Sequence, residues 1–327
     1  MGTRNGFSLS QALEDWFAAV KRPMPWRRRP TPYGCWLSEI MMQQTTYAAV
    51  LPYYERFLKK FPTVEKLAAA DEAEVLKAWE GLGYYARARN LLRAARLIVP
   101  SAPSRTGAAR WPATSAEWAG LPGVGPYTAA ALASVLNGER VPVVDGNVAR
   151  VFARVWNLTD DFTKLPARSK LAERLAPEIA KSRVPGDFNQ AMMELGACVC
   201  TPKSPTCGDC PLAAICAAHK EGTETEYPVR PKRKELPVRR ETAVIIRNER
   251  GQVLLVQNRE GGLLKGLWEL PTVEPTFEVT QVFSHFKLEQ RNFAAIRSDA
   301  EFRDPKAVPL TTATRRTLGL AKEGRRQ

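Results

Sequence analysis

Residues 121–128 read Leu-Pro-Gly-Val-Gly-Pro-Tyr-Thr, and they set our expectation for the architecture around them. Thr114 or Ser115 can cap a short helix ahead of this stretch, because a hydroxyl can accept a hydrogen bond from the first helical turn. Gly123 and Gly125 permit a tight turn, and proline suits the first position of the helix that follows. The stretch therefore predicts two helices joined by a hairpin.

A glycine hairpin of this kind brings bare backbone N–H groups to a helix N-terminus, where they can hold a phosphate without reading sequence. The chain has 48 lysines and arginines against 34 acidic residues, a net charge of +14, which is typical of polyanion-binding proteins. Together these features indicate a helix–hairpin–helix DNA-binding element. The alternatives are a helical hairpin that uses Pro-Gly for its turn alone, and a protein that is merely soluble and basic.

Around this element, residues 1–220 follow helical periodicity. Apolar residues recur at helical spacing in segments that proline and glycine separate. These segments are Leu9–Val20, Leu37–Ala48, Leu67–Trp79, Asn90–Val99, Ala129–Leu136 and Leu171–Ile179. We therefore predict a mainly α N-terminal region.

The composition changes after residue 227. Residues 228–240 are basic and broken by prolines, which suits a linker lying along DNA better than a nuclear localisation patch. Four segments beyond the linker resemble strands: 242–247, 253–257, 282–288 and 293–296. The first two flank a polar turn, as in a hairpin. We expect a small α+β domain over residues 241–314 and a polar, disordered tail over 315–327.

Four cysteines fall within seventeen residues: Cys200, Cys207, Cys210 and Cys216. Thiolates this close, with glycine and proline between them, can form a pocket for one compact metal centre. Four cysteines suit a 4Fe–4S cluster, whereas zinc ribbons usually bring two Cys-x-x-Cys pairs and this segment has one. We predict the cluster, with zinc as the competitor and disulfides last. Cys35 and Cys198 fit no ligand spacing, and we expect them to be buried small apolar residues.

Two acidic residues are candidates for chemistry. Asp145 stands between an apolar run and a glycine, and taken alone its best interpretation is an N-cap of the next helix. Glu39 falls off the apolar stripe of its segment, as a solvated surface residue or a functional carboxyl would. The polar residues 43–45 suit contacts with base edges, and residues 79–90 place aromatics beside arginines. That mixture is expected where bases are displaced and phosphates are held.

Taken together, these segments resemble MutY-type adenine DNA glycosylases, within the helix–hairpin–helix superfamily that includes endonuclease III. The similarity runs from about Leu13 to Cys216 without a large gap. It is carried by Pro25–Arg27, Ser38–Thr45, Gly81–Tyr85, Leu121–Gly125, Val144–Val148, Phe188–Gln190 and the cysteine loop. The resemblance implies a helix–hairpin–helix glycosylase domain over residues 1–227, with two helical halves and an iron–sulfur loop at 200–216.

The resemblance also implies a mechanism. Adenine would be flipped out of the duplex, and Glu39, with its pKa raised by burial, would protonate adenine N7. Asp145 would stabilise the positive charge left on the deoxyribose, or form a transient covalent bond with it. Endonuclease III-type enzymes carry a lysine nucleophile where this chain has Tyr127, and a phenol cannot form a Schiff base. We therefore expect base removal without strand cleavage.

The family's DNA contacts map onto further positions of this sequence. The resemblance assigns recognition of the flipped adenine to three residues: Arg27, Gln190 and Trp26. It assigns contacts with the rest of the DNA to Gln44, Thr45, Tyr84, Arg87, Gly123 and Gly125. Of these, Gln44 and Tyr84 would enter the base stack near the orphan base.

Residues 241–314 resemble the Nudix-like domain with which this family reads 8-oxoguanine opposite adenine. Its reading loop would present Phe283, Ser284 and His285. The glutamate-rich Nudix box that binds Mg²⁺ is missing, so we expect no nucleotide hydrolysis. Only twelve residues separate Pro271 from Ser284, where the family usually has a longer insert. We expect a shortened domain with weaker discrimination.

The resemblance thus predicts an adenine DNA glycosylase of base excision repair. It would act as a monomer on adenine opposite 8-oxoguanine or guanine in double-stranded DNA. The alternatives are another mismatch glycosylase of the superfamily, for example one removing thymine from G·T, and a non-catalytic DNA-binding protein on the same scaffold. The sequence begins without a signal-peptide pattern, and no apolar run approaches the ~20 residues of a membrane span. We expect a cytoplasmic, nucleoid-associated protein with no membrane partner.

Overall fold

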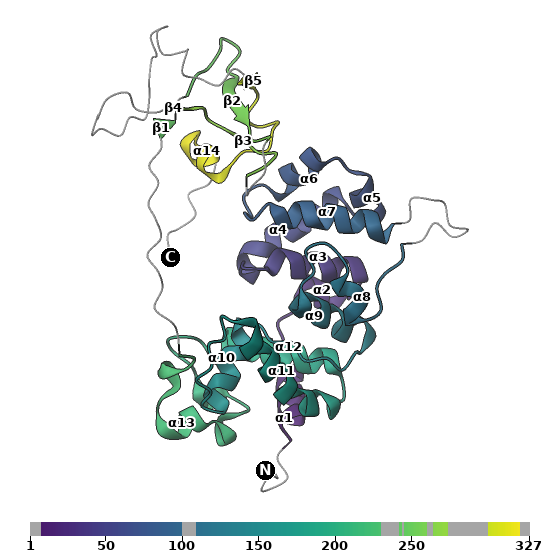
Figure 1. Cartoon of the computed structure of the whole chain (residues 1–327), viewed down its shortest axis with the longest axis vertical. Helices are drawn as coiled ribbons and strands as arrows, with labels where there is room; N and C mark the ends of the chain where they lie inside the picture. Colours follow the sequence, from purple (N-terminus) through teal and green to yellow (C-terminus); the bar gives the residue numbers. More distant parts are fainter. Residues whose placement is uncertain are drawn as a thin grey trace. The chain divides into compact units, whose positions relative to one another are not determined.

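The computed structural model describes residues 8–99, 109–229, 242–243, 245–259, 264–273 and 300–320. The chain divides into two compact units, Met1–Ile40 with Arg110–Lys234 and Met41–Ala109 with Glu235–Gln327 (Figure 1). In this division the segment 41–109 groups with the C-terminal region. The N-terminal helical region is thereby shared between both units.

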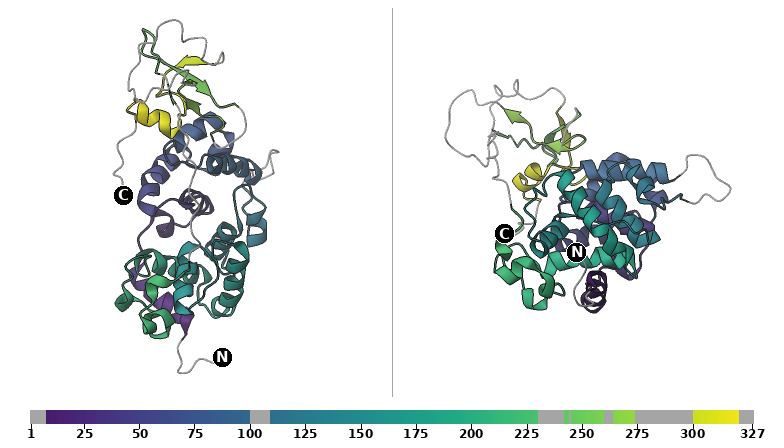
Figure 2. Two further views of the ribbon diagram at one scale, coloured as in Figure 1. Left: turned by 60° about the vertical axis from the view of Figure 1, so that its left-hand side comes forward. Right: turned by 60° about the horizontal axis from the view of Figure 1, so that its bottom comes forward.

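The described part of the first unit is helical, and Figure 2 shows it from two further sides. Its α-helices are α1 (Leu9–Val20), α2 (Pro25–Arg28), most of α3 (Pro32–Met42), α8 (Ser115–Ala119), α9 (Pro126–Asn137), α10 (Gly146–Val155), α11 (Leu165–Ala180), α12 (Pro185–Cys198) and α13 (Ala217–Glu221). Short 3-10 turns lie at Cys207–Asp209, Ala213–Ile215 and Glu224–Glu226. α12 packs against both α1 and α10, and the core between them includes Leu13, Phe152 and Phe188. Burial of each such side chain contributes about 2 kcal/mol.

The predicted helical hairpin is present. Thr114 caps α8 through a capping box, and α8 packs against α9. Gly123 has a φ of +80°, a conformation that residues with a Cβ rarely adopt, and Pro126 is the first residue of α9. Trp118 is fully buried, whereas Gly123 and Gly125 are exposed. The turn therefore presents glycine backbone to solvent on a fixed support.

α12 and α10 approach each other closely at Gly196. A Cβ at position 196 would lie 2.5 Å from the Cβ of Asn147 and 3.0 Å from its Cα. Glycine is therefore the residue that allows the two backbones to touch. Asn147 lies in the first turn of α10, so this contact also fixes the start of that helix.

The second unit combines helices with small sheets. Its helices are α4 (Tyr47–Lys60), α5 (Val64–Ala69), α6 (Glu72–Trp79), α7 (Ala86–Ile98) and α14 (Thr312–Thr317). β1 (Thr242–Ala243) pairs with β4 (Thr272–Val273), and β2 (Val253–Gln257) lies between β3 (Trp268–Glu269) and β5 (Glu301–Arg303), all antiparallel. Val253, Leu255, Trp268, Leu270 and Leu310 form the small core of this β region.

Contacts within the second unit join the β region to the loop between α6 and α7. The N–H of Leu310 donates to Oε1 of Glu80 at 2.9 Å, and the hydroxyl of Tyr85 donates to the Leu310 carbonyl at 3.3 Å. Glu80 also pairs with Lys77 at 2.9 Å. The C-terminal region is therefore attached by buried polar contacts as well as by its chain connection.

Some details differ from the predictions. The segment Leu37–Ala48 is not one helix, because α3 ends at Met42 and α4 begins at Tyr47. The strand 253–257 is confirmed, whereas within 242–247 only β1 and a bridge at Arg247 pair. The expected strands 282–288 and 293–296 lie outside the described residues. α14 includes Arg315 and the described structure continues to Leu320, past the tail boundary suggested by composition. None of the described helices is both long and apolar enough to cross a membrane.

We predict that Gly196→Ala destabilises the protein, although alanine is the better helix former. The new methyl group would overlap Asn147 at 2.5 Å, which should cost about 1–3 kcal/mol and exceed the ~1 kcal/mol gain in helix propensity. Thermal unfolding followed by circular dichroism measures the effect. Gly146→Ala is the control, because a Cβ there has no neighbour within 4 Å. Equal melting temperatures for the two variants would show that the helices separate without cost.

Candidate active site

Glu39 lies in the last turns of α3, partly buried between two buried neighbours. Burial, and then the nearby Asp145 carboxylate, raise the pKa of Glu39 to about 7. A hydrogen bond from Tyr127 and the charge of Arg27 oppose this rise. A carboxyl with such a pKa holds a proton in a large fraction of molecules at neutral pH and can donate it.

Asp145 is the N-cap of α10, as its local sequence suggested. Its Oδ1 accepts a hydrogen bond from the Val148 N–H at 2.7 Å, and its Oδ2 accepts one from Asn147 Nδ2 at 2.9 Å. Burial raises the pKa of Asp145, while these hydrogen bonds oppose the rise. A helix N-terminus also favours an anion. Because two close carboxyls resist ionising together, the capped Asp145 is the better anion and Glu39 the better proton holder.

Tyr127, the second residue of α9, joins the two carboxyls to the hairpin. Its hydroxyl donates a hydrogen bond to Sδ of Met193 at 3.1 Å and also interacts with the Glu39 carboxyl, where it acts to lower the pKa of Glu39. Burial, followed by the charges of Glu39 and Asp145, raises the pKa of Tyr127 well above its ordinary value. The phenol therefore stays neutral beside the two carboxyls.

Arg27 and Gln190, which were both expected at the adenine, meet in the structure. Arg27 Nε donates to Gln190 Oε1 at 2.8 Å, and Arg27 Nη2 lies 3.0 Å from Oε2 of Glu194. Glu194 also accepts hydrogen bonds from Arg22. Burial acts to raise the pKa of Glu194, but the two arginines bring it below its ordinary value. Glu194 is thus a fixed anion that orients Arg27.

Sequence reasoning missed Glu194, although it lies four residues after Gln190 on α12 and so shares its face. Trp26 is buried, with 6% of its surface exposed. Its contact with adenine therefore stays a prediction.

The residues expected to enter the base stack lie on loops of the second unit. Gln44 and Tyr84 both have positive φ values, 59° and 49°, and both side chains are exposed. Arg87 is only 8% exposed, and its expected contact with DNA stays a prediction. In the structure it hydrogen-bonds to backbone carbonyls and to Thr45 Oγ1.

The four clustered cysteines line one cavity, together with apolar residues of α10 and the cysteine loop. Burial raises the pKa of Cys207 and of Cys210 to about 11, with further contributions from Glu224 on Cys207 and from the neighbouring cysteines on both. Thiols placed this way can ionise together only around a positive centre. The donor set therefore fits a soft metal centre such as the predicted cluster.

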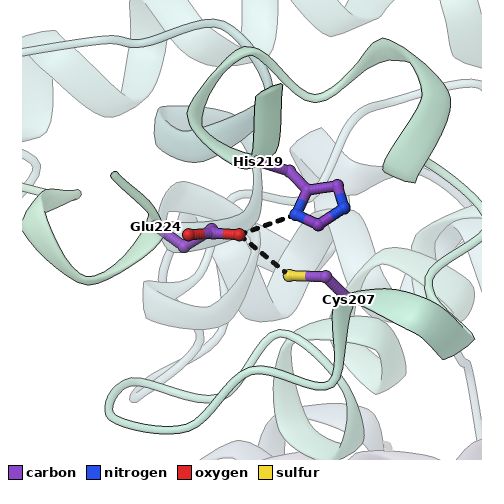
Figure 3. Close-up of side chains that lie close together, drawn as sticks. All are labelled: Cys207, His219 and Glu224. Carbon is purple, nitrogen blue, oxygen red and sulfur yellow. Dashed lines mark hydrogen bonds and ion pairs between the residues drawn. The ribbon is translucent and has the colours of Figure 1, made fainter. Parts of the chain in front are cut away.

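A histidine lies at the edge of this cavity. His219 Nδ1 is 2.7 Å from Oε1 of Glu224, and Cys207 Sγ is 3.5 Å from the same oxygen (Figure 3). Each of the three residues offers one ligand atom within 4.8 Å of the others. Imidazole, carboxylate and thiolate are zinc ligands as well, so zinc stays open as the competitor. The signal that sequence reasoning passed over is that His219 follows Cys216 by three residues.

Two buried arginines attach α10 to the cysteine loop. Arg150 Nε donates to the Cys200 carbonyl at 2.8 Å. Arg154 Nη1 lies 3.2 Å from Cys200 Sγ and 2.8 Å from the Thr201 carbonyl. Arg154 therefore places a positive charge beside a thiol of the candidate metal site. Of the remaining cysteines, Cys35 is buried as expected, whereas Cys198 is exposed at the end of α12, which corrects that prediction.

The residues expected to read 8-oxoguanine, Phe283, Ser284 and His285, lie outside the described residues. Their assignment therefore rests on the sequence alone.

Comparison with known proteins defines the class first. Residues 37–177 match the HhH-GPD superfamily of base excision DNA repair proteins. The structure of a thermostable thymine-DNA glycosylase aligns with a TM-score of 0.56 and 26% identity, over 65% of this chain and 95% of that one. A non-covalent endonuclease III–DNA complex aligns with a TM-score of 0.53 at 22% identity, covering 65% of this chain and 95% of its own, which shows the shared fold.

Relatives in sequence then define the family. The adenine DNA glycosylase of Homo sapiens is 35% identical over 80% of this chain and 57% of its own length. That of Arabidopsis thaliana is 36% identical, covering 81% and 47%, and that of Buchnera aphidicola subsp. Schizaphis graminum is 32% identical, covering 82% and 76%. The chain therefore belongs to the adenine DNA glycosylase family. It spans about half the length of the human and plant relatives that it matches.

We predict that Glu39→Gln stabilises the protein at high pH relative to wild type. A folded pKa of about 7 against an ordinary 4.5 means that the stability from proton binding is full below about 4.5 and is lost as the pH rises through about 7. Glutamine cannot ionise, so the variant does not lose this stability. The difference in free energy of unfolding between the variant and wild type should therefore shift in favour of the variant by on the order of 2 kcal/mol between pH 5 and pH 8.

Melting temperatures of both proteins between pH 5 and pH 8 test this prediction. Glu173→Gln, which changes an exposed glutamate on α11, is the control and should show no such trend. A difference between Glu39→Gln and wild type that stays constant with pH would contradict the assignment of a raised pKa.

Proposed function

We propose that this protein is an adenine DNA glycosylase of base excision repair that removes adenine mispaired with 8-oxoguanine or guanine. The observation that carries the proposal is the pair of neighbouring carboxyls with different environments. Glu39 is partly buried with a pKa of about 7, and Asp145 caps the N-terminus of α10, which favours its anion. Membership of the adenine DNA glycosylase family supports adenine as the base.

The two carboxyls suit the cleavage of an N-glycosidic bond. Adenine is a poor leaving group as an anion, and Glu39 delivers its proton to N7 as the bond to C1′ breaks. The electron pair of that bond leaves with adenine, and the deoxyribose keeps a positive charge that Asp145 stabilises. Water then adds to C1′ and leaves an abasic site.

Tyr127 supports base removal as the whole reaction. A lysine at this place could form a Schiff base with C1′ and cleave the strand by β-elimination, whereas a phenol lacks the amine. Tyr127 instead hydrogen-bonds to Glu39 and orients the carboxyl.

DNA and base recognition follow from the exposed groups of the site. Arg27 and Gln190 are joined by a hydrogen bond and contact the flipped adenine, with Trp26 behind them. The exposed turn at Gly123 and Gly125 receives a backbone phosphate. Gln44, Thr45 and Tyr84 approach the orphan base. Recognition of 8-oxoguanine by Phe283, Ser284 and His285 is proposed on sequence similarity alone.

Cys200, Cys207, Cys210 and Cys216 would hold a 4Fe–4S cluster. The convergence of the four cysteines on one cavity supports a metal centre, and their spacing in the sequence favours the 4Fe–4S cluster over zinc. When bound, the cluster would provide a compact anchor that shapes the loop of residues 200–216 around it. Arg154 balances negative charge beside Cys200.

We predict that single-turnover excision is fastest on A·8-oxoguanine duplexes, slower on A·G and negligible on G·T. Without alkaline treatment the strand should stay intact. Glu39→Gln and Asp145→Asn should each lower the rate at least about 100-fold, because each removes an acid–base or charge contribution of that size. Excision of thymine from G·T would favour the alternative, a glycosylase of the same superfamily that acts on G·T mismatches. Near-normal rates for Glu39→Gln would show that Glu39 is not the acid.

The Asp145→Asn variant separates the effect of the negative charge of Asp145 on activity from its effect as the N-cap of α10. Asn still accepts a hydrogen bond from Val148 N–H, so Asp145→Asn should keep its melting temperature, whereas Asp145→Ala should lose about 1 kcal/mol of stability. Unfolding of both variants is the control for the excision assay. A large loss of stability in the Asn variant would mean that its lost activity reflects the helix start.

We predict that anaerobically purified protein contains about four iron and four sulfide per chain, as the family's cluster requires. Metal and acid-labile sulfide analysis measures this, and absorption near 400 nm supports it. Cys198→Ser is the control and should keep the full content, because Cys198 is exposed and lies outside the cavity lining. Zinc without sulfide would overturn the cluster in favour of a mixed site that includes His219.

A further inference from the structure

Two loops of the second unit share an unusual backbone conformation. Residues 43–46 join α3 to α4, and residues 80–85 join α6 to α7. Each carries one non-glycine residue with positive φ, Gln44 at 59° and Tyr84 at 49°. Side chains disfavour this region, so such residues persist only where the surrounding structure holds them. Something in the fold therefore fixes both loops.

Arg87, in the first turn of α7, contacts both loops at once. Its Nη1 donates to the carbonyls of Met41 at 2.7 Å and Gln43 at 2.6 Å. Its Nη2 lies within hydrogen-bond distance of three groups: Thr45 Oγ1 at 3.3 Å, the Leu82 carbonyl at 3.4 Å and the Gly83 carbonyl at 3.3 Å. One guanidinium thus ties the residues on both sides of Gln44 to the residues just before Tyr84.

The packing around Arg87 also limits its movement. The guanidinium carbon lies 5.4 Å from the ring centroids of both Trp79 and Tyr84. Arg87 is 8% exposed, whereas Tyr84 is 58% exposed. The cation therefore sits under the Tyr84 ring and leaves its outer surface to solvent. A lysine could not replace this geometry, because an ammonium lacks the planar fork of donors that reaches two loops.

We propose that Arg87 is a positioning residue that locks Gln44 and Tyr84 into one preformed wedge, which enters the base stack at a mispair. The inference rests on the proposed function, in which these two side chains approach the orphan base. Preforming the wedge means that the loops are ordered before DNA arrives, so binding does not have to order them. Arg87 acts through both loops and makes no DNA contact itself.

Hydrogen exchange of the free protein tests the lock without DNA. Arg87→Lys should raise exchange at the amides of residues 43–46 and 82–85 together, because it removes the group that both loops share. Arg93→Lys is the matched control, since Arg93 is exposed on the same helix and pairs with Asn90. Faster exchange in the 82–85 loop alone, or in neither loop, would overturn the proposal.

Binding tests the wedge. The probe is a duplex with 2′-fluoro-2′-deoxyadenosine, which resists cleavage, opposite 8-oxoguanine, and a fully paired duplex is the reference. Arg87→Lys and Arg87→Met should weaken mispair binding roughly ten- to hundredfold and change paired-duplex binding far less, because only the former uses the preformed wedge. Wild-type affinity of the Arg87→Lys variant for the mispair would contradict the proposal. Because lysine keeps the positive charge, this variant still provides the test if Arg87→Met does not fold.

A double-mutant cycle separates positioning from general stability. Tyr84→Ala should weaken mispair binding in the wild-type background. It should have little further effect in the Arg87→Lys background, because the Tyr84 ring is no longer held in position there. Equal effects in both backgrounds would show that Arg87 does not act through Tyr84. If wild type binds mispairs no better than paired DNA, the proposed function fails, while the exchange result still decides whether the lock exists.

Discussion

Two carboxyls that share a partly buried site cannot both ionise without a large electrostatic cost, and the proposed active site depends on which of the two keeps its proton. Burial raises the pKa of both carboxyls, but at Asp145 the N-terminus of α10 and two hydrogen bonds oppose the rise, whereas at Glu39 the charge of Asp145 adds to it. The proton therefore stays on Glu39. This division would give one acid and one anion from two side chains of the same kind, as the proposed cleavage of a glycosidic bond requires.

The rest of the first unit can be understood as support for this division. Gly196 lets α12 press against Asn147, and Asn147 holds one oxygen of Asp145. Tyr127, placed by the hairpin that also presents the glycine turn, reaches Glu39 from α9. Residues 121–128 therefore set the start of α9, which would both receive DNA and place Tyr127 beside Glu39.

Sequence predicted the parts of the site that depend on local spacing. The hairpin, the cap at Asp145 and the convergence of four cysteines follow from residues close together in the chain. What sequence missed depends on distant contacts. Glu194 gains its role from Arg22 and Arg27, which lie more than 160 residues away. Cys198 was expected inside on composition alone, yet its position at a helix end leaves it exposed.

Arg87 shows why residue type cannot separate a DNA contact from an internal clamp. An arginine among aromatics predicts phosphate contact, and only the carbonyls of residues 41–43 and 82–83, brought together by folding, reveal that its donors are used inside the protein. The same loops break the periodic segment that appeared to run from Leu37 to Ala48, because Gln44 leaves the helical region of φ. α3 carries Glu39 and ends at Met42, so three residues of one helix separate the acid from the start of the clamped loop.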